Sequence, residues 1–141
     1  MHLSRESEYG LKAMIYLAQQ PPATVLTLQQ IAEGRELPGG FLAKTLQKLA
    51  RHGLLQSFRG RRRGYSLARD PSEIRLRELL EAIEGPDLFN RCLFWGRRCG
   101  DSNPCLLHEG WSEIKPHLTE FIETVTLGEL AKNGGADASA V

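Results

Sequence analysis

Apolar side chains recur at three- and four-residue spacing near the start of the chain and predict a first amphipathic helix. It begins near Ser4, a residue type that caps helices well, and runs to about Gln19. Its apolar positions are Leu11, Met14, Ile15, Leu17 and Ala18. Pro21 and Pro22 end it, because proline lacks a backbone donor and clashes with the preceding turn.

A short helix is predicted to follow at Leu28–Glu33. Thr27 and Gln30 are spaced as a capping box, in which each side chain bonds the other residue's backbone N–H. The short helix buries Leu28 and Ile31, and Gly34 is expected to end it in the left-handed conformation.

A longer helix is predicted from about Pro38 to His52, closed by Gly53. The positions expected to face inward are Phe41, Leu42, Thr45, Leu46 and Leu49. A short helix, a tight turn and a longer helix form a helix-turn-helix arrangement, which also occurs in many helical bundles.

Two short strand-like segments come next, at 54–58 and 65–68. Between them lies a short basic loop, 59–64, that carries four arginines, with glycines at positions 60 and 64 as turn residues. A β-hairpin with a basic tip, directly after a helix-turn-helix, is typical of a winged helix.

The remaining chain is predicted to be mostly helical. An amphipathic helix at Ser72–Glu84 ends at Gly85-Pro86, and 89–105 is expected to be a loop. A longer helix follows at about Leu106–Val125, and 126–130 forms a last short helical turn. The long helix places on one side Trp111, Ile114, Leu118, Phe121 and Ile122. The predicted fold class is therefore mainly α with a small β-hairpin.

Composition and charge narrow the function classes. Hydrophobic residues make up 41% and charged residues 25%, as in an ordinary soluble globular protein. No apolar run approaches the roughly 20 residues that span a bilayer, and the polar N-terminus lacks a signal core, so we expect a cytoplasmic location. Residues 1–70 carry 11 Lys/Arg against 5 Asp/Glu, whereas residues 71–141 carry 7 against 12, so the basic half is the one expected to approach a polyanion.

The candidate DNA-binding residues lie on the longer helix and in the wing. The donors of an arginine side chain match phosphate and its charge is attracted to narrow grooves, so the wing candidates include Arg59, Arg61, Arg62 and Arg63. Gly60 is a further candidate, because glycine lets the backbone turn tightly and approach the sugar-phosphate closely. On the helix, Gly39, Gly40 and Ala43 are best placed at base edges, and Lys44, Gln47, Lys48 and Arg51 are expected to face away from the core. The alternative is a solvated basic loop that binds nothing, but its position at a hairpin tip favours DNA. The glycine spacing does not match a nucleotide-binding loop.

The three cysteines form the second candidate site. Cys92, Cys99 and Cys105 lie within fourteen residues, and His108 follows the last by three positions. An odd number of cysteines without a secretion signal argues against a disulfide framework and favours a metal or redox site. This spacing suits zinc or an iron–sulfur cluster equally, and free thiols are the remaining alternative. His108 could instead bond backbone groups at a helix start.

Other classes of protein fit less well. A thiol enzyme would need a base and an orienting group at a recognisable spacing, and none is found, so we predict that the chain is not an enzyme. A pure protein-interaction module would leave the arginine wing unexplained.

With these residues in view, residues 1–131 resemble the IscR-like, NsrR-like and RirA-like transcription regulators, also called the Rrf-two family. The segments that carry the resemblance are Leu3-Ser4 through Tyr9-Gly10-Leu11, Arg59 to Tyr65, Ile83-Glu84-Gly85-Pro86, the three cysteines and Thr126 to Leu130. The resemblance implies a homodimer in which the helix at 106–125 crosses its partner. It also implies that the cysteines hold an iron–sulfur cluster and that the state of this cluster tunes DNA affinity. The implied signals are iron supply, nitric oxide or oxidants, and the implied regulator is often a repressor.

The resemblance leaves the fourth cluster ligand open. In the IscR-like branch a histidine at the position of His108 completes the site, which favours a 2Fe–2S cluster. In the NsrR-like branch an acidic residue of the other subunit does so, and Glu8 stands at that position, which favours 4Fe–4S. We prefer His108 and 2Fe–2S, with zinc as the alternative metal.

Three departures from the IscR-like pattern concern the cluster and the operator. The gap between Cys92 and Cys99 is longer, Arg63-Gly64 replaces a double glycine, and Ala43 replaces an acidic residue that contacts bases.

The expected domain organisation has three parts. A winged helix-turn-helix occupies 1–70, a connecting helix, cysteine loop and dimerisation helix occupy 71–131, and a disordered tail occupies 132–141.

Overall fold

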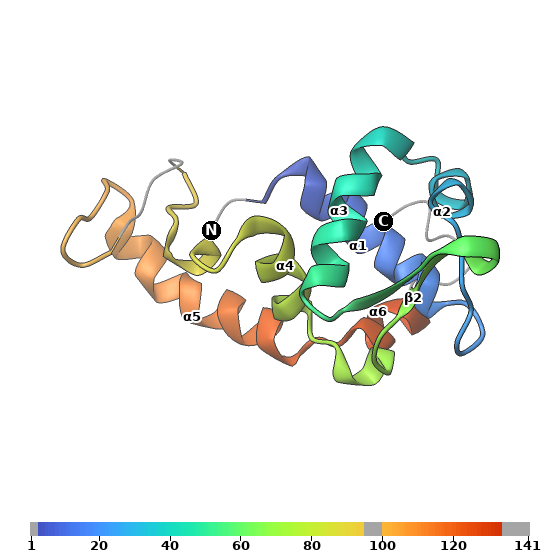
Figure 1. Cartoon of the computed structure of the whole chain (residues 1–141). Helices are drawn as coiled ribbons and strands as arrows, with labels where there is room; N and C mark the ends of the chain where they lie inside the picture. The colour runs from blue at the N-terminus through green and yellow to red at the C-terminus, as the bar shows by residue number, and fades with distance from the viewer. Residues whose placement is uncertain (1–2, 95–99, 134–141) are drawn as a thin grey trace.

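The structure is a computed structural model that describes residues 3–94 and 100–133. Figure 1 shows a helical molecule with one small hairpin, as the predicted fold class requires. The α-helices are α1 (Arg5–Ala18), α2 (Leu28–Arg35), α3 (Gly39–Arg51), α4 (Leu76–Glu84), α5 (His108–Thr124) and α6 (Leu127–Asn133). The strands are β1 (Leu55–Phe58) and β2 (Gly64–Leu67), and short 3-10 helices lie at Gly60–Arg62, Pro71–Glu73 and Leu88–Asn90.

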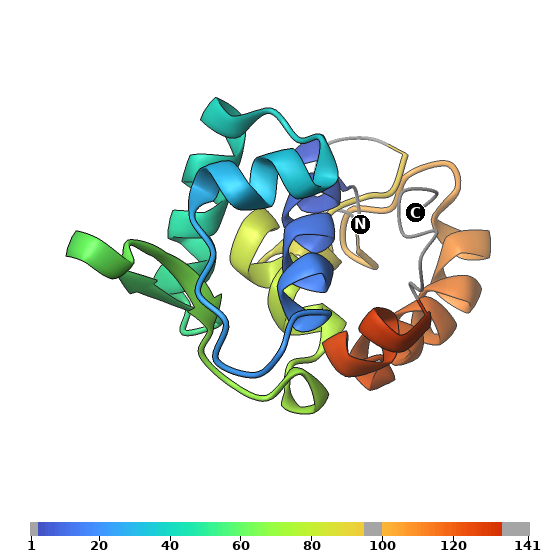
Figure 2. The same ribbon diagram turned by 90° about the vertical axis from the view of Figure 1, so that its right-hand side faces the viewer.

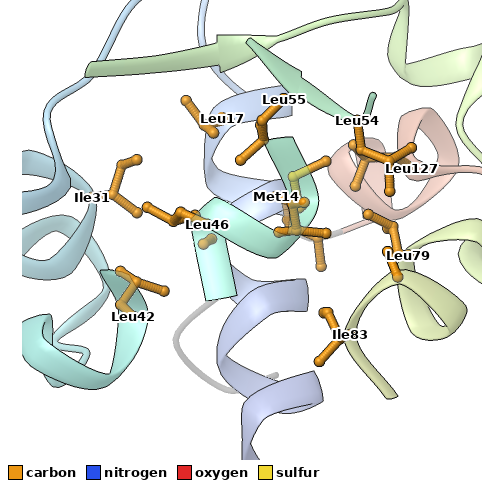
Figure 3. Close-up of a cluster of buried hydrophobic side chains, with 14 of the residues drawn as sticks. Met14, Leu17, Ile31, Leu42, Leu46, Leu54, Leu55, Leu79, Ile83 and Leu127 are labelled. Carbon is orange, nitrogen blue, oxygen red and sulfur yellow. The ribbon is translucent and has the colours of Figure 1, made fainter. Parts of the chain in front are cut away.

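The main core forms around α1, which contacts α2, α3, α4 and α6. Figure 3 shows Met14 of α1 among leucine and isoleucine side chains that converge from these helices and the hairpin. The fully buried members include Met14, Ile31, Leu42, Leu46, Leu49 and Leu79. Each such side chain stabilises the fold by about 1.5–3 kcal/mol through burial of apolar surface, so this core holds the helix-turn-helix rigidly.

The hairpin is fastened to the start of α2. Its antiparallel register runs from Leu55 opposite Leu67 to Phe58 opposite Gly64. Leu26 and Tyr65 exchange both backbone hydrogen bonds, at 3.0 and 2.8 Å. Gly64 has φ +149°, and a Cβ there would lie 2.4 Å from the Leu26 carbonyl oxygen, so only glycine allows this approach.

A second cluster joins α4 to α5. Its buried members are Leu76, Leu80, Leu88, Phe89, Trp111 and Ile122. Arg77 of α4 also forms an ion pair with Glu123 of α5. Ile114 and Phe121 were expected on the apolar side of this helix, but they are 59% and 56% exposed in the single chain.

Gly34 was expected to end the second helix, and this prediction was wrong. The helix continues to Arg35, and Glu36 adopts the left-handed conformation, with φ 52° and ψ 45°. Gly34 lies instead against the ring of Tyr16, where a Cβ would come within 2.5 Å of it. A packing contact therefore explains this glycine.

Phe41 was expected to face the core, but it is 47% exposed. Its ring meets that of Tyr9 edge-on, with centroids 5.7 Å apart. The other inward positions of α3, which are Leu42, Thr45, Leu46 and Leu49, are buried as predicted.

The helix predicted at Ser72–Glu84 begins only at Leu76. Residues 74–76 instead run antiparallel to 125–127, with hydrogen bonds from Leu76 N–H to the Val125 carbonyl and from Leu127 N–H to the Ile74 carbonyl. The last helix extends to Asn133, two residues into the predicted tail, and the rest of that tail lies outside the described residues. In the described part of the chain, no helix has the length and apolar character needed to cross a membrane.

Candidate DNA-binding surface and cysteine site

The exposed face of α3 carries most of its predicted DNA-binding residues. Gly40, Lys44, Gln47 and Arg51 are exposed, whereas Gly39 and Ala43 are half-buried. The first turn of α3 presents two glycines and the exposed ring of Phe41, so the long polar side chains lie further along the helix.

Lys48 differs from the prediction, because it does not point freely away from the core. Its ammonium donates to Glu6 Oε2 at 3.0 Å and to the Ile83 carbonyl at 3.3 Å. Glu6 Oε1 in turn accepts from the Thr45 hydroxyl at 3.2 Å. Lys48 therefore ties α3 to α1 and α4.

The wing places its four arginines at the surface. Arg59, Arg61, Arg62 and Arg63 are all exposed, and Gly60 between them has φ +83°. Within residues 3–94 and 100–133 no carboxylate forms an ion pair with any of these four side chains. Their charge is therefore available to an external anion.

A groove separates the wing from the helix-turn-helix. The start of α2 lines it with Thr27, Leu28 and Gln29, and α3 contributes Gln47. The wing side is lined by Ser57, Phe58, Arg59, Arg63, Gly64 and Tyr65. Gln29 and Ser57 were not among the DNA-binding residues expected from the sequence. The available signal for Gln29 was the capping box, which places it in the first turn of α2. The two reciprocal hydrogen bonds of this box are 2.9 and 3.1 Å long.

The structure brings two of the three cysteines together. Cys92 is fully buried, Cys105 is half-buried, and their sulfur atoms are 3.7 Å apart. Two thiolates bound to one tetrahedral metal with bonds of about 2.3 Å would be about 3.8 Å apart, so this pair fits a shared metal or cluster iron. Cys99 lies outside the described residues, and among those described no group of three or more metal-binding side chains is assembled.

His108 begins α5, and its backbone N–H donates to the Cys105 carbonyl at 3.1 Å. Its Nε2 lies 3.0 Å from Asp101 Oδ1. Histidines that bind metals commonly donate their second ring N–H to a carboxylate, which fixes the orientation of the ring. This contact is compatible with a ligand role for His108.

Glu8, the alternative ligand, lies on the outer side of α1. Its side chain is 54% exposed and accepts a hydrogen bond from Lys12 at 2.8 Å. That bond and the charge of Lys12 lower the pKa of Glu8, which keeps the carboxylate ionised.

Glu84, at the end of α4, has a buried carboxylate that the sequence analysis did not predict as a functional group. The Glu84 side chain is only 7% exposed. Burial alone raises the pKa of Glu84, but hydrogen bonds from Ser4 and Ser7 and the charge of Arg91 more than offset this, so its pKa lies below the usual value. The available signal was the Ile83-Glu84-Gly85-Pro86 segment.

Comparison with known proteins identifies the family. Residues 3–133 match the Rrf2 family model, described as an iron-dependent transcriptional regulator. The transcriptional regulator IscR of Escherichia coli is 32% identical over 133 residues, which cover 94% of this chain and 82% of IscR. CymR, the global cysteine regulator of B. subtilis, superposes with a TM-score of 0.78 at 26% identity, covering 94% of this chain and 98% of CymR. IscR of T. potens superposes with a TM-score of 0.73, also at 26% sequence identity, and the match covers 97% of this chain and 90% of that IscR chain. The chain therefore belongs to the Rrf2 family of DNA-binding transcription regulators.

Proposed function

We propose that this chain binds operator DNA as a homodimer and that an iron–sulfur cluster on Cys92, Cys99 and Cys105 controls its affinity. The observation that carries this proposal is the 3.7 Å separation of the Cys92 and Cys105 sulfurs beside the start of α5. It is supported by the iron-dependent description of the family and by the IscR relatives.

His108 is our preferred fourth ligand, because α5 begins there and Asp101 contacts its ring. It would favour a 2Fe–2S cluster. Glu8 of the partner subunit is the alternative, favouring 4Fe–4S, because the ionised, exposed carboxylate on α1 could bind iron across a dimer.

For DNA we propose that the start of α3 enters the major groove, with Gly39, Gly40 and Ala43 nearest the bases and Lys44, Gln47 and Arg51 alongside. The wing residues Arg59, Gly60, Arg61, Arg62 and Arg63 would follow the phosphates or the minor groove, as their exposed charges allow. Lys48 contributes indirectly, since its ammonium holds α3 against Glu6.

The cluster would supply an iron centre whose charge and ligand bonds change on oxidation, nitrosylation or loss. The chain's own part is mechanical. As cluster ligands, Cys92 would hold the segment after α4 and Cys105 the segment just before α5, where the structure places them. A shift of this loop would move α5 and change the spacing of the two α3 helices, which must match half-sites about 34–36 Å apart.

The test is anaerobic purification followed by an absorption spectrum and assays of iron, sulfide and zinc. A brown protein with matching iron and sulfide is expected, and the loaded and cluster-free forms should bind one operator with different Kd values at one salt concentration. The Cys92→Ser variant is expected to lack the cluster, whereas Ser102→Ala, in the same loop, is the matched control that should retain it. Equal Kd values for the two forms would remove the sensing role.

A second candidate is regulation by the thiols themselves, because the same sulfur pair could form a disulfide after a small movement. A relative, CymR of Staphylococcus aureus, has been solved in an oxidised form. Here the Cys92 and Cys105 thiols would lose two protons and two electrons to a peroxide, which would be reduced to water. A colourless, metal-free protein whose DNA affinity changes with peroxide would select this candidate, and one zinc per chain would instead indicate a structural site.

A further inference from the structure

The cysteine loop and the wing lie at opposite ends of the molecule, as Figure 1 shows. A signal from the cysteines must therefore reach α3 through the elements between them. The helix α4 lies between these ends and contacts α1 and α3 as well as the 3-10 helix at Leu88–Asn90, which leads to the cysteines.

Arg91, the residue directly before Cys92, binds the end of α4. Its Nη2 donates to the Glu84 carbonyl at 2.7 Å and to Asp87 Oδ1 at 2.9 Å, and its Nη1 lies 3.6 Å from Glu84 Oε2. The guanidinium therefore connects the backbone at the buried cysteine to both the carbonyl and the carboxylate of Glu84.

Glu84 passes this connection to the first turn of α1. Its Oε1 accepts hydrogen bonds from Ser4 N–H at 2.7 Å and from the hydroxyls of Ser4 and Ser7 at 2.6 Å each. Burying a carboxylate is costly unless it is bonded, so these donors hold the start of α1 to the end of α4.

The first turn of α1 reaches α3 through Glu6, which bonds Lys48 and Thr45, while Lys48 also bonds the Ile83 carbonyl. The three helices also touch closely at Gly10. A Cβ on Gly10 would lie 2.5 Å from Ile83 Cδ1 and 2.9 Å from Thr45 Cγ2, so α1 packs against α3 and α4 without a gap.

We propose that Arg91 is a positioning residue that couples the cysteine loop to α3 through Glu84 and the first turn of α1. The inference rests on the proposed function, since it says how the state of that loop reaches the DNA. A continuous set of hydrogen bonds and packed helices between two sites is one physical route by which coupling is carried.

The experiment compares Arg91→Met with Arg69→Met in the full-length protein. Arg69 is the matched control because it makes a similar ion pair, 2.8 Å to Glu78, at the other end of α4. For each protein the ratio of the operator Kd without cluster to that with cluster is measured at one salt concentration, with iron and sulfide assayed alongside. Hydrogen exchange of residues 39–51 in both states gives a readout that does not depend on DNA.

The wild-type ratio should depart from one by about 5- to 150-fold, the range of typical coupling. Arg91→Met should bring the ratio close to one and remove the difference in hydrogen exchange at α3, while Arg69→Met keeps both. Ser7→Ala removes one hydrogen bond to Glu84 without touching the loop, and it should also move the ratio toward one. This variant decides the matter if Arg91→Met does not fold.

A wild-type ratio retained in Arg91→Met, or in Ser7→Ala when the arginine variant does not fold, overturns the coupling role while cluster sensing stands. A wild-type ratio of one overturns cluster sensing, and the coupling role with it.

Discussion

Gly64 and Glu84 are two residues whose neighbours leave little choice of side chain. Gly64 lies against the backbone of Leu26 at the base of the wing, and Glu84 lies buried among donors from α1. Both constraints come from residues distant in the sequence, so each position joins two elements. Changes at either position should therefore affect stability more than an exposed substitution does.

Gly64→Ala is expected to destabilise the chain by about 1–3 kcal/mol, because the new Cβ would lie 2.4 Å from a backbone oxygen and at φ +149°. Urea denaturation measures the change in the free energy of unfolding. Gly40→Ala is the control, since its Cβ would meet no atom of the described structure within 4 Å. Equal stability of the two variants would contradict the packing argument.

The ionised Glu84 is expected to stabilise the fold at neutral pH. Its pKa is lowered on folding, so its contribution is complete above the unfolded pKa of about 4.3 and is lost as the pH falls through the lower folded value. Glu84→Gln should therefore reduce the free energy of unfolding at pH 7 and flatten its decline between about pH 5 and 3.

Urea denaturation at a series of pH values checks this expectation. Glu120→Gln, at an exposed position of α5, is the control that should keep the wild-type profile. A Glu84→Gln profile parallel to that of the wild type would show that Glu84 does not contribute to the acid dependence.

At the scale of elements, the wing and the helix-turn-helix form one surface. The bridge between Leu26 and Tyr65 joins the hairpin to the residue before the Thr27 cap of α2. The arginines at the hairpin tip therefore have a fixed position relative to α3, with the groove between them. Each arginine that neutralises a DNA phosphate makes the binding more dependent on salt, because counterions are released.

The double variant Arg61→Gln and Arg62→Gln is expected to weaken DNA binding by a similar factor for all sequences. The slope of log affinity against log salt should fall by up to about 0.9 for each phosphate that the protein no longer neutralises. A filter-binding or anisotropy titration at several salt concentrations measures this slope. Lys132→Gln, on α6 away from the wing, should leave it unchanged; an unchanged slope in the arginine variant would exclude phosphate binding at the tip.

At the scale of the whole molecule, Figure 2 shows the wing on one side and α5 on the other. The helix α5 and the residues just before it leave apolar side chains exposed in the single chain, including Leu106 at 95%, Ile114 at 59% and Phe121 at 56%. A second copy crossing α5 would cover them, as the proposed homodimer requires.

As a member of a family of transcription regulators, the chain is not an enzyme, in agreement with the sequence prediction.

Phe121→Glu is expected to shift the protein from dimer to monomer, because it places a charge on the apolar face of α5. Sedimentation velocity measures the change, and operator affinity should fall at least about tenfold when two half-sites are no longer bound together. Glu120→Gln serves again as the control, on the adjacent position. A dimeric Phe121→Glu protein would place the interface elsewhere.

The sequence predicted the helix-turn-helix, the wing and the cysteine loop because these depend on local signals. Proline and the Thr27 cap mark helix limits, and glycines bound the basic hairpin. It erred at Gly34 and at the start of α4, where Tyr16 and residues 125–127 decide the local conformation. Such contacts join residues far apart in the chain, and periodicity does not report them.

The sequence by itself determined the order of the elements, the basic wing and the clustering of the cysteines, because each follows from residues near one another along the chain. Only the tertiary structure decided that Lys48 is bound to Glu6, that Phe41 lies at the surface and that Cys92 meets Cys105. It also decided that Arg91, Glu84 and Ser7 form one hydrogen-bonded group. The physical reason is that burial and bonding depend on which helices pack together, and packing is a property of the folded chain.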